Sequence, residues 1–146
     1  KGNVIAGVQD GTAAVSGQSG EVLSSTVTGV AVAATGAVGD VTSLTLSPGD
    51  WLISAHATIS GGATGLASGS QQKLSVVTTS ATNGTEGDTM QVNTILALSA
   101  NGKHALSIPQ LRVNISSATT IYLTSSVTYA AGSPTAAAKL IATRMR

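Results

Sequence analysis

Apolar and polar side chains alternate between residues 51 and 59, and this pattern constrains the fold more than any other part of the sequence. The odd positions carry the apolar residues Trp51, Ile53, Ala55, Ala57 and Ile59, and the even positions are mostly polar. Successive side chains of a β-strand point to opposite faces, so a period of two indicates a strand with one buried face. The segment is therefore predicted to be a half-buried strand with Trp51 on the inner face and His56 on the outer.

The same alternation recurs later in the chain and predicts two further strands. Apolar positions alternate with polar ones in the two sets Leu111, Val113, Ile115 and Ile121, Leu123, Val127, Tyr129. Frequent β-branched residues between turn residues predict additional strands at 21–28, 41–47, 73–79, 92–99 and 136–145. The dipeptide Pro48-Gly49 suits a turn, Asn101-Gly102 and Asn83-Gly84 suit hairpin turns, and the glycine-rich stretch 60–70 is expected to be a loop.

Short strands separated by turns, with almost no helical pattern, predict an all-β fold built as an antiparallel β-sandwich of jelly-roll type. An immunoglobulin-like sandwich is the alternative, and the absence of cysteine removes the pattern of cysteines around a tryptophan that is typical of it. Residues 1–20 are expected to form an N-terminal arm or linker, and residues 21–146 the β-sandwich domain. Because the chain does not begin with methionine, a segment before Lys1 is expected to be missing.

Large side chains are scarce, which limits the core that one copy can build. The chain contains no phenylalanine, one tryptophan and two tyrosines among 146 residues. Aromatic side chains supply much of the burial in a typical core, so this chain would gain from burying more surface against copies of itself.

Charge is scarce as well, since charged residues make up 9% of the chain and the formal net charge is +1. That balance argues against a nucleic-acid partner held by a basic face. No apolar run approaches the length that spans a bilayer, so membrane insertion is not expected. Without cysteine, disulfides and thiolate metal sites are excluded.

No arrangement of residues predicts catalysis. The acidic residues are Asp10, Glu21, Asp40, Asp50, Glu86 and Asp88, and they are expected to cap loops or face solvent. A calcium site around Glu86 and Asp88 is the weaker alternative. The two histidines, His56 and His104, have no neighbouring motif and are interpreted as surface or interface residues, and outward-facing Tyr122 as a packing residue or a stacking platform for sugar. No catalytic, cofactor-binding or metal-binding residue is assigned, no cofactor is expected, and receptor-binding residues stay unassigned.

Three segments carry a family resemblance. They are SGEVLSSTV (19–27), VTSLTLSPGDWLISAHATIS (41–60) and IPQLRVNISSATTIYLTSSVTYAAGSPTAAAKLIATRMR (108–146). In this order they resemble a domain found in virion fibre and appendage proteins of tailed bacteriophages. The matching features are Gly20-Glu21, Gly49-Asp50-Trp51, Arg112, Tyr122-Leu123 and Arg144-Met145-Arg146. The closing segment departs from the family in carrying small alanines and a methionine between its last arginines.

The resemblance implies a homotrimeric β-domain on the surface of a virion, as a head fibre, tail fibre or capsid decoration. Its expected partners are copies of itself, other virion proteins such as capsid or tail, and a host-surface glycan. Two alternatives stay open. One is a carbohydrate-binding or adhesin module of a cellular protein, and the other is a polysaccharide hydrolase using Asp50, Glu86 and Asp88. The loops at 60–70 and 80–90 are the places where binding residues are expected.

Overall fold

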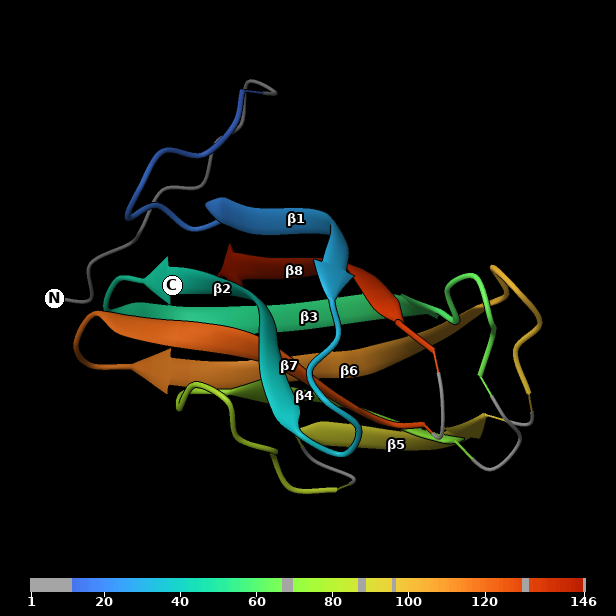
Figure 1. Cartoon of the computed structure of the whole chain (residues 1–146). Coiled ribbons are helices and arrows are strands. Elements are labelled where there is room, and N and C mark those ends of the chain that lie inside the picture. Colours follow the sequence, from blue (N-terminus) through green and yellow to red (C-terminus); the bar gives the residue numbers. More distant parts are fainter. Residues whose placement is uncertain (1–11, 67–69, 87–88, 96, 130–131, 146) are drawn as a thin grey trace, which may run out of the picture.

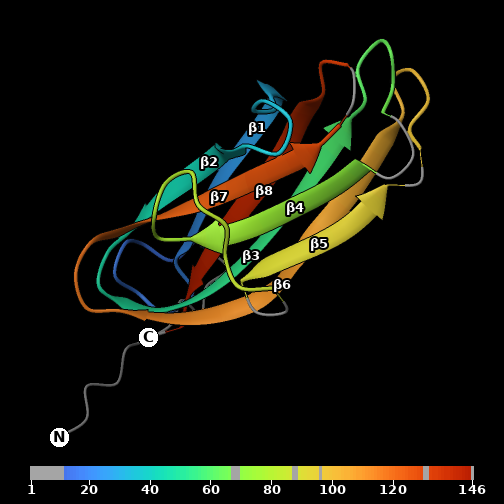
Figure 2. The same cartoon turned by 60° about the horizontal axis from the view of Figure 1, so that its bottom comes forward.

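The computed structural model describes residues 12–66, 70–86, 89–95, 97–129 and 132–145. Within these residues, eight strands form two antiparallel sheets of four strands that pack face to face (Figures 1 and 2). The first sheet has the order β1-β8-β3-β6 and the second β2-β7-β4-β5. The strands are β1 (Val22–Ala31), β2 (Val38–Leu46), β3 (Gly49–Ser60), β4 (Ser70–Val77), β5 (Met90–Ile95), β6 (Lys103–Ile115), β7 (Thr119–Thr128) and β8 (Thr135–Arg144).

The strand pairing is nested. The outermost strands pair with each other as β1 with β8, then β2 with β7, β3 with β6 and β4 with β5. The described chain is therefore one long hairpin rolled so that successive pairs alternate between the two sheets. This is the jelly-roll arrangement, so the predicted fold class is confirmed.

The alternating segment at 51–59 forms β3 as expected. Its odd residues are buried, with Trp51, Ala57 and Ile59 fully so, while His56 is exposed on the opposite face. All the predicted strands exist, but their bounds differ: β6 begins at Lys103, well before the alternating set Leu111, Val113 and Ile115, and β5 ends at Ile95 and not at residue 99. The position of β3 explains its sequence: it lies inside the first sheet between β8 and β6, and one of its faces covers the second sheet.

The turn predictions are only partly correct. Pro48 and Gly49 lie where the chain passes from β2 to β3, but Gly49 has a φ of 154° and already belongs to β3. Asn101-Gly102 does turn the chain, with φ of 58° at Asn101, but it joins no hairpin because β5 and β6 belong to different sheets. The turn instead bonds to the loop after β3, since Asn101 N donates a hydrogen bond to Gly62 O at 2.7 Å. Asn83-Gly84 is not a turn either, because the turn after β4 falls at Ser80-Ala81.

The core is made of aliphatic residues and one indole. The largest fully buried apolar side chains are Trp51, Leu46, Ile53, Ile59, Leu74, Leu123, Leu140 and Val127. On β8 the inner face is built mostly from alanine, so β8 presents little bulk to the second sheet. Trp51 is the one aromatic residue among the buried hydrophobic residues described, in line with the scarcity of large side chains in the sequence.

The polar face of β7 is more deeply buried than its alternation predicted. Thr124 and Ser126 alternate with the apolar residues Leu123 and Val127, yet they are buried too. Loops cover them: Thr124 Oγ1 donates to Thr82 O at 2.8 Å, and Ser126 Oγ donates to Gly36 O at 3.1 Å. The connection that follows β4 thus folds back over the outer face of the second sheet, where Asp40 Oδ1 accepts a hydrogen bond from Ala81 N.

Candidate functional site

One end of the sandwich is closed by a buried arginine. Arg144, the last residue of β8, lies opposite Trp51 in the register, and its guanidinium carbon lies 4.3 Å from the centroid of the indole. A guanidinium over an indole face is stabilised by the ring quadrupole. Trp51 is fixed in turn because its Nε1 donates to Ser47 O at 3.0 Å. The side chain of Arg144 is only 4% exposed, so it acts as a lid on the core at this end.

Glu21 balances the charge of Arg144. Arg144 Nε donates to Glu21 Oε2 at 2.8 Å, and Gly17 N donates to the same oxygen at 2.8 Å. Burial raises the pKa of Glu21, but the Gly17 amide and the Arg144 guanidinium outweigh it, so the pKa lies below its ordinary value. Arg144 also donates to Pro48 O at 2.7 Å and to Ser47 Oγ. The arrangement has the complete hydrogen bonding that a buried ion pair needs.

A second ion pair lies on the outer face of the first sheet, close to the same end. Arg112 of β6 donates two hydrogen bonds from Nε and Nη2 to the carboxylate of Asp50 on β3, with Nε 2.9 Å from Oδ1. The carboxylate raises the pKa of the Arg112 guanidinium. Asp50 is buried, whereas the Arg112 side chain is 60% exposed. The residues that carry the family resemblance, Glu21, Asp50, Trp51, Arg112 and Arg144, therefore meet in structural contacts.

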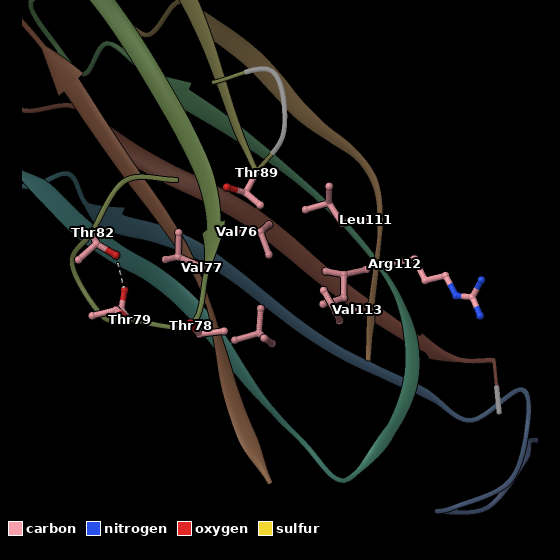
Figure 3. A pocket seen from close by; sticks show the side chains of 11 residues that line it. Val76, Val77, Thr78, Thr79, Thr82, Thr89, Leu111, Arg112 and Val113 are labelled. Atoms are coloured by element: carbon pink, nitrogen blue, oxygen red, sulfur yellow. Dashed lines mark hydrogen bonds between the residues drawn. The ribbon is translucent and has the colours of Figure 1, made fainter. Parts of the chain in front are cut away.

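A pocket of about 440 Å³ opens beside this end, between β6 and the connection from β4 to β5. Its apolar lining comes from Ile53, Val76, Val77, Leu111, Val113 and Ile121, and its hydroxyl groups from Thr78, Thr79, Thr82 and Thr89. Figure 3 shows Val77 and three of the threonines (Thr78, Thr79, Thr82) on one side, Leu111 and Val113 on the other, and Val76 and Thr89 between them. Arg112 contributes to the wall, but its side chain extends away from the pocket, as the same view shows.

Local irregularities of the two strands create this pocket. Strand β5 begins opposite Ser75, so Val76 and Val77 of β4 extend past it and the chain leaves the sheet. On the other wall, the register between β3 and β6 shifts, because Ile53 faces Leu111 while Ala55 faces Ile108. Pro109 lies in this β-bulge, where a residue without an N–H is tolerated on an edge strand. The bulge redirects the following residues of β6 toward the pocket.

The lining of the pocket is mostly aliphatic, with a few hydroxyl groups. Two of its hydroxyl groups are already engaged, because Thr82 Oγ1 donates to Thr79 O at 2.7 Å and Thr89 Oγ1 accepts from Thr85 N at 2.9 Å. None of the lining residues is acidic, histidine or aromatic. An aliphatic group of a ligand or of another chain fits such a lining, whereas sugar stacking would need a ring. The pocket was missed in the sequence, although its threonines fall in and beside the loop at 80–90.

The histidines lie apart from the pocket lining. His56 is exposed on the outer face of the first sheet. His104 is half-buried, with Nδ1 2.9 Å from Gln72 Oε1 and Nε2 3.2 Å from Asn93 Nδ2. With the Asn93 amide oriented as a donor, Nδ1 carries the proton and donates to Gln72. The ring thus links β6 of the first sheet to β4 and β5 of the second.

The acidic residues divide into three groups. Glu21 and Asp50 were expected to cap loops or face solvent, and this prediction is wrong because both are buried in ion pairs. Asp40 does hold a loop, since it accepts hydrogen bonds from Ser80 Oγ and Ala81 N. Glu86 is exposed, and Asp10 and Asp88 lie outside the described residues. Within the described ranges, no group of three metal-ligating side chains comes together.

Half-buried Tyr122 lies opposite Ser43 on β2 and Val77 on β4. It lies on the outer face of β7, as the alternation predicted. Long apolar helices of the kind that cross a membrane do not occur in the described part of the chain.

Comparison with known proteins finds similarity in structure but not in sequence. No protein-family model matches the chain, and no curated protein sequence matches it. The solved structure of infectious bursal disease virus Gx strain is similar to 96% of this chain, with a TM-score of 0.52 and 13% identity. The VP2 subviral particle of infectious bursal disease virus matches 96% of the chain at 14% identity and a TM-score of 0.49. The match covers 36% and 37% of those viral chains, respectively. At such identity the first likeness shows a shared fold.

Proposed function

We propose that this chain is a non-enzymatic structural protein of a virion, a homotrimeric surface fibre or decoration protein of a tailed bacteriophage. The observation that carries the proposal is the nested jelly-roll pairing, which extends over the described chain and is similar to a chain of a virus particle. Jelly rolls serve in viral capsid and lectin domains. The resemblance to fibre and appendage domains favours the use in a virus particle over the use in a lectin.

The placement of the resemblance residues supports the proposal. A catalytic carboxylate needs access to substrate, but Glu21 is buried under Arg144 and Asp50 is held by Arg112. These residues pair with each other inside the domain, as expected of residues that hold a fold together. The thin core supports association of copies, because contacts between them would bury further apolar surface. We keep the division into an arm at 1–20 and a sandwich at 21–146 within the proposal.

The partners follow from this function. The chain would associate with copies of itself and with other virion proteins such as capsid or tail, on the particle surface. Attachment to a host-surface glycan is the finer part of the proposal. The pocket beside β6 offers no aromatic platform among its lining residues, so a glycan contact would use other loops.

Two measurements test the proposal. Light scattering coupled to size exclusion, over a hundredfold range of protein concentration, should give the mass of three copies. A glycan array probed with the same material separates the alternatives. A monomer at every concentration that binds glycans strongly would instead indicate the carbohydrate-binding or adhesin module of a cellular protein. Cleavage of a surface polysaccharide that is lost in Asp50→Ala or Glu86→Ala would contradict the non-enzymatic function.

A further inference from the structure

A serine interrupts the apolar inner face of β7. Leu123 and Val127 are fully buried in the core, and Ser125 lies between them on the same face of the strand. Its residue exposure is only 3%, and its Oγ has no hydrogen-bond partner among the described residues. Burying a hydroxyl without a partner is unfavourable, and buried polar groups are nearly always bonded to protein or to ordered water. A partner for this hydroxyl is therefore expected.

Ser125 lines a cavity of about 90 Å³ between the two sheets. The lining also includes Ala31, Ala33 and Ala136, which contribute one methyl group each, and Gly39, which contributes no side chain. Gly39 lies directly opposite Ser125 in the register of β2 and β7. These residues are too small to fill the space between the sheets, so the cavity follows from the sequence.

The start of the connection between β1 and β2 forms one wall of the cavity, and hydrogen bonds hold it in place. Val32 N donates to Pro134 O at 3.1 Å, and Tyr129 Oη donates to Ala33 O at 3.3 Å. Val32 and Ala33 both line the cavity. This wall cannot move inward to fill the space without breaking these bonds.

Strand β2 adds backbone groups that its ladder with β7 does not use. The register of the two strands shifts between Asp40 and Thr42, so Val41, which lines the cavity, lies in a β-bulge. The extra residue of a bulge is left unpaired in the ladder. A buried water molecule typically makes two to four hydrogen bonds, and the hydroxyl of Ser125 and the backbone at this bulge are suitable partners.

The size of the cavity decides which kind of ligand it takes. Since water occupies about 30 Å³ per molecule, the cavity has room for up to about three water molecules. Pockets for organic ligands are larger, at about 300–1,000 Å³. A metal ion would need several oxygen ligands, but Asp40, the carboxylate among the lining residues, already accepts hydrogen bonds from Ser80 Oγ and Ala81 N.

We propose that this cavity is a binding site for ordered water, with one water molecule hydrogen-bonded to Ser125 Oγ. The water satisfies the serine and links β7 to β2 across the space that the small side chains leave. The site explains why a serine stands in an otherwise apolar row of β7. It concerns the interior of a single copy, so it does not depend on the proposed function.

A high-resolution crystal structure of the full chain tests the site directly. The expected result is density for a water oxygen about 2.5–3.0 Å from Ser125 Oγ. A cavity without density in such a map would overturn the proposal, and this result needs no variant that has to fold.

Ser125→Ala tests the site in solution. Oxygen-17 relaxation counts the water molecules that stay inside a protein, and this variant should have at least one fewer than wild type. Ser126→Ala is the matched control, because Ser126 is also buried but its Oγ already donates to Gly36 O. The control should keep the count of wild type. An unchanged count in Ser125→Ala, or the same loss in Ser126→Ala, contradicts the proposal.

The midpoint of urea unfolding gives a second check with a definite sign. Replacing a hydroxyl that lacks any partner with a methyl group stabilises a protein, whereas removing one that is bonded to water does not. The midpoint of Ser125→Ala should therefore not exceed that of wild type. A higher midpoint would show that the hydroxyl has no partner and that the cavity is dry.

Discussion

The two ends of the sandwich are closed in different ways. At one end Arg144, Glu21 and Trp51 fill the space between the sheets with charged and aromatic groups. At the other end, seen at the right of Figure 1, the loops after β3 and β5 meet through their backbones. There Gly61 N donates to Gly102 O at 2.9 Å, and the backbones of Leu66 and Leu98 bond to each other in both directions. A chain with few large side chains can thus close a core with a buried ion pair or with glycine loops.

The largest expected effect breaks the charged end. Replacing Arg144 with alanine removes the indole contact and leaves Glu21 buried without its cation. Breaking a buried ion pair in this way costs about 3–5 kcal/mol, so the free energy of unfolding in urea should fall by that amount at fixed protein concentration. Arg144→Lys, which keeps the charge, should lose less. A loss below about 1 kcal/mol for the alanine variant would show that the ion pair is not what closes this end.

The next largest effect tests the glycine end. Gly65 has a φ of 73°, and a β-carbon there would collide with the carbonyl oxygen of Leu98. Gly65→Ala should therefore cost more than the roughly 1–2 kcal/mol of the left-handed backbone conformation alone. Gly36→Ala is the matched control, because Gly36 has a φ of 77° and no atom near the added carbon. Thermal unfolding compares the two variants, and equal losses would contradict a role for close backbone packing.

A smaller effect concerns pH, because the charged end contains the titratable carboxylate of Glu21. The pKa of Glu21 in the folded state lies below its ordinary value of 4.5, so folding favours the ionised carboxylate. The resulting stability is present above pH 4.5 and is lost as the pH falls through the folded pKa. Glu21→Gln should lower stability at pH 7 and flatten its pH dependence below pH 5. Urea unfolding from pH 7 to pH 3 measures both, with Glu86→Gln as a control at an exposed carboxylate.

The smallest expected effect is at Arg112, on the solvent side of the charged end. Its side chain is mostly exposed, and Arg112→Lys keeps the charge next to Asp50 while losing the paired hydrogen bonds. The melting temperature should change least of all these variants, and the difference from wild type should shrink further in 1 M salt. A drop as large as that of Arg144→Ala would show that the outer pair of Asp50 and Arg112 stabilises this end as much as buried Arg144 does.

The strands were predictable from the sequence because alternation is a local property. Trp51 and Ile53 mark the buried face of β3 within a few residues, so no knowledge of distant segments is needed. The contacts of the charged end were not predictable, because Glu21 and Arg144 are 123 residues apart and the sequence around each residue does not indicate its partner. The burial of Thr124 was missed for the same reason, since a loop from elsewhere covers it.

Turn chemistry predicted where the chain bends but not what the bend connects. Asn101-Gly102 has the residues of a hairpin, and its neighbours could have paired with each other. The nested pairing sends β5 and β6 to different sheets instead. The pocket depends on two such tertiary facts, the start of β5 opposite Ser75 and the bulge at Pro109, so nothing in the sequence around its threonines indicated it.

The nested pairing also determines when during synthesis the domain can become stable. Strand β8 is inserted between β1 and β3, which therefore join in one sheet only after residues 135–144 have been made. Until then β3 has no partner strand on its β8 side, and the core has no lid at Arg144. Folding dominated by such distant contacts takes about milliseconds to seconds in isolated domains. A nascent chain of this protein therefore keeps one edge of β3 unpaired until residues 135–144 are available, and such an edge is prone to pairing with other chains in that interval.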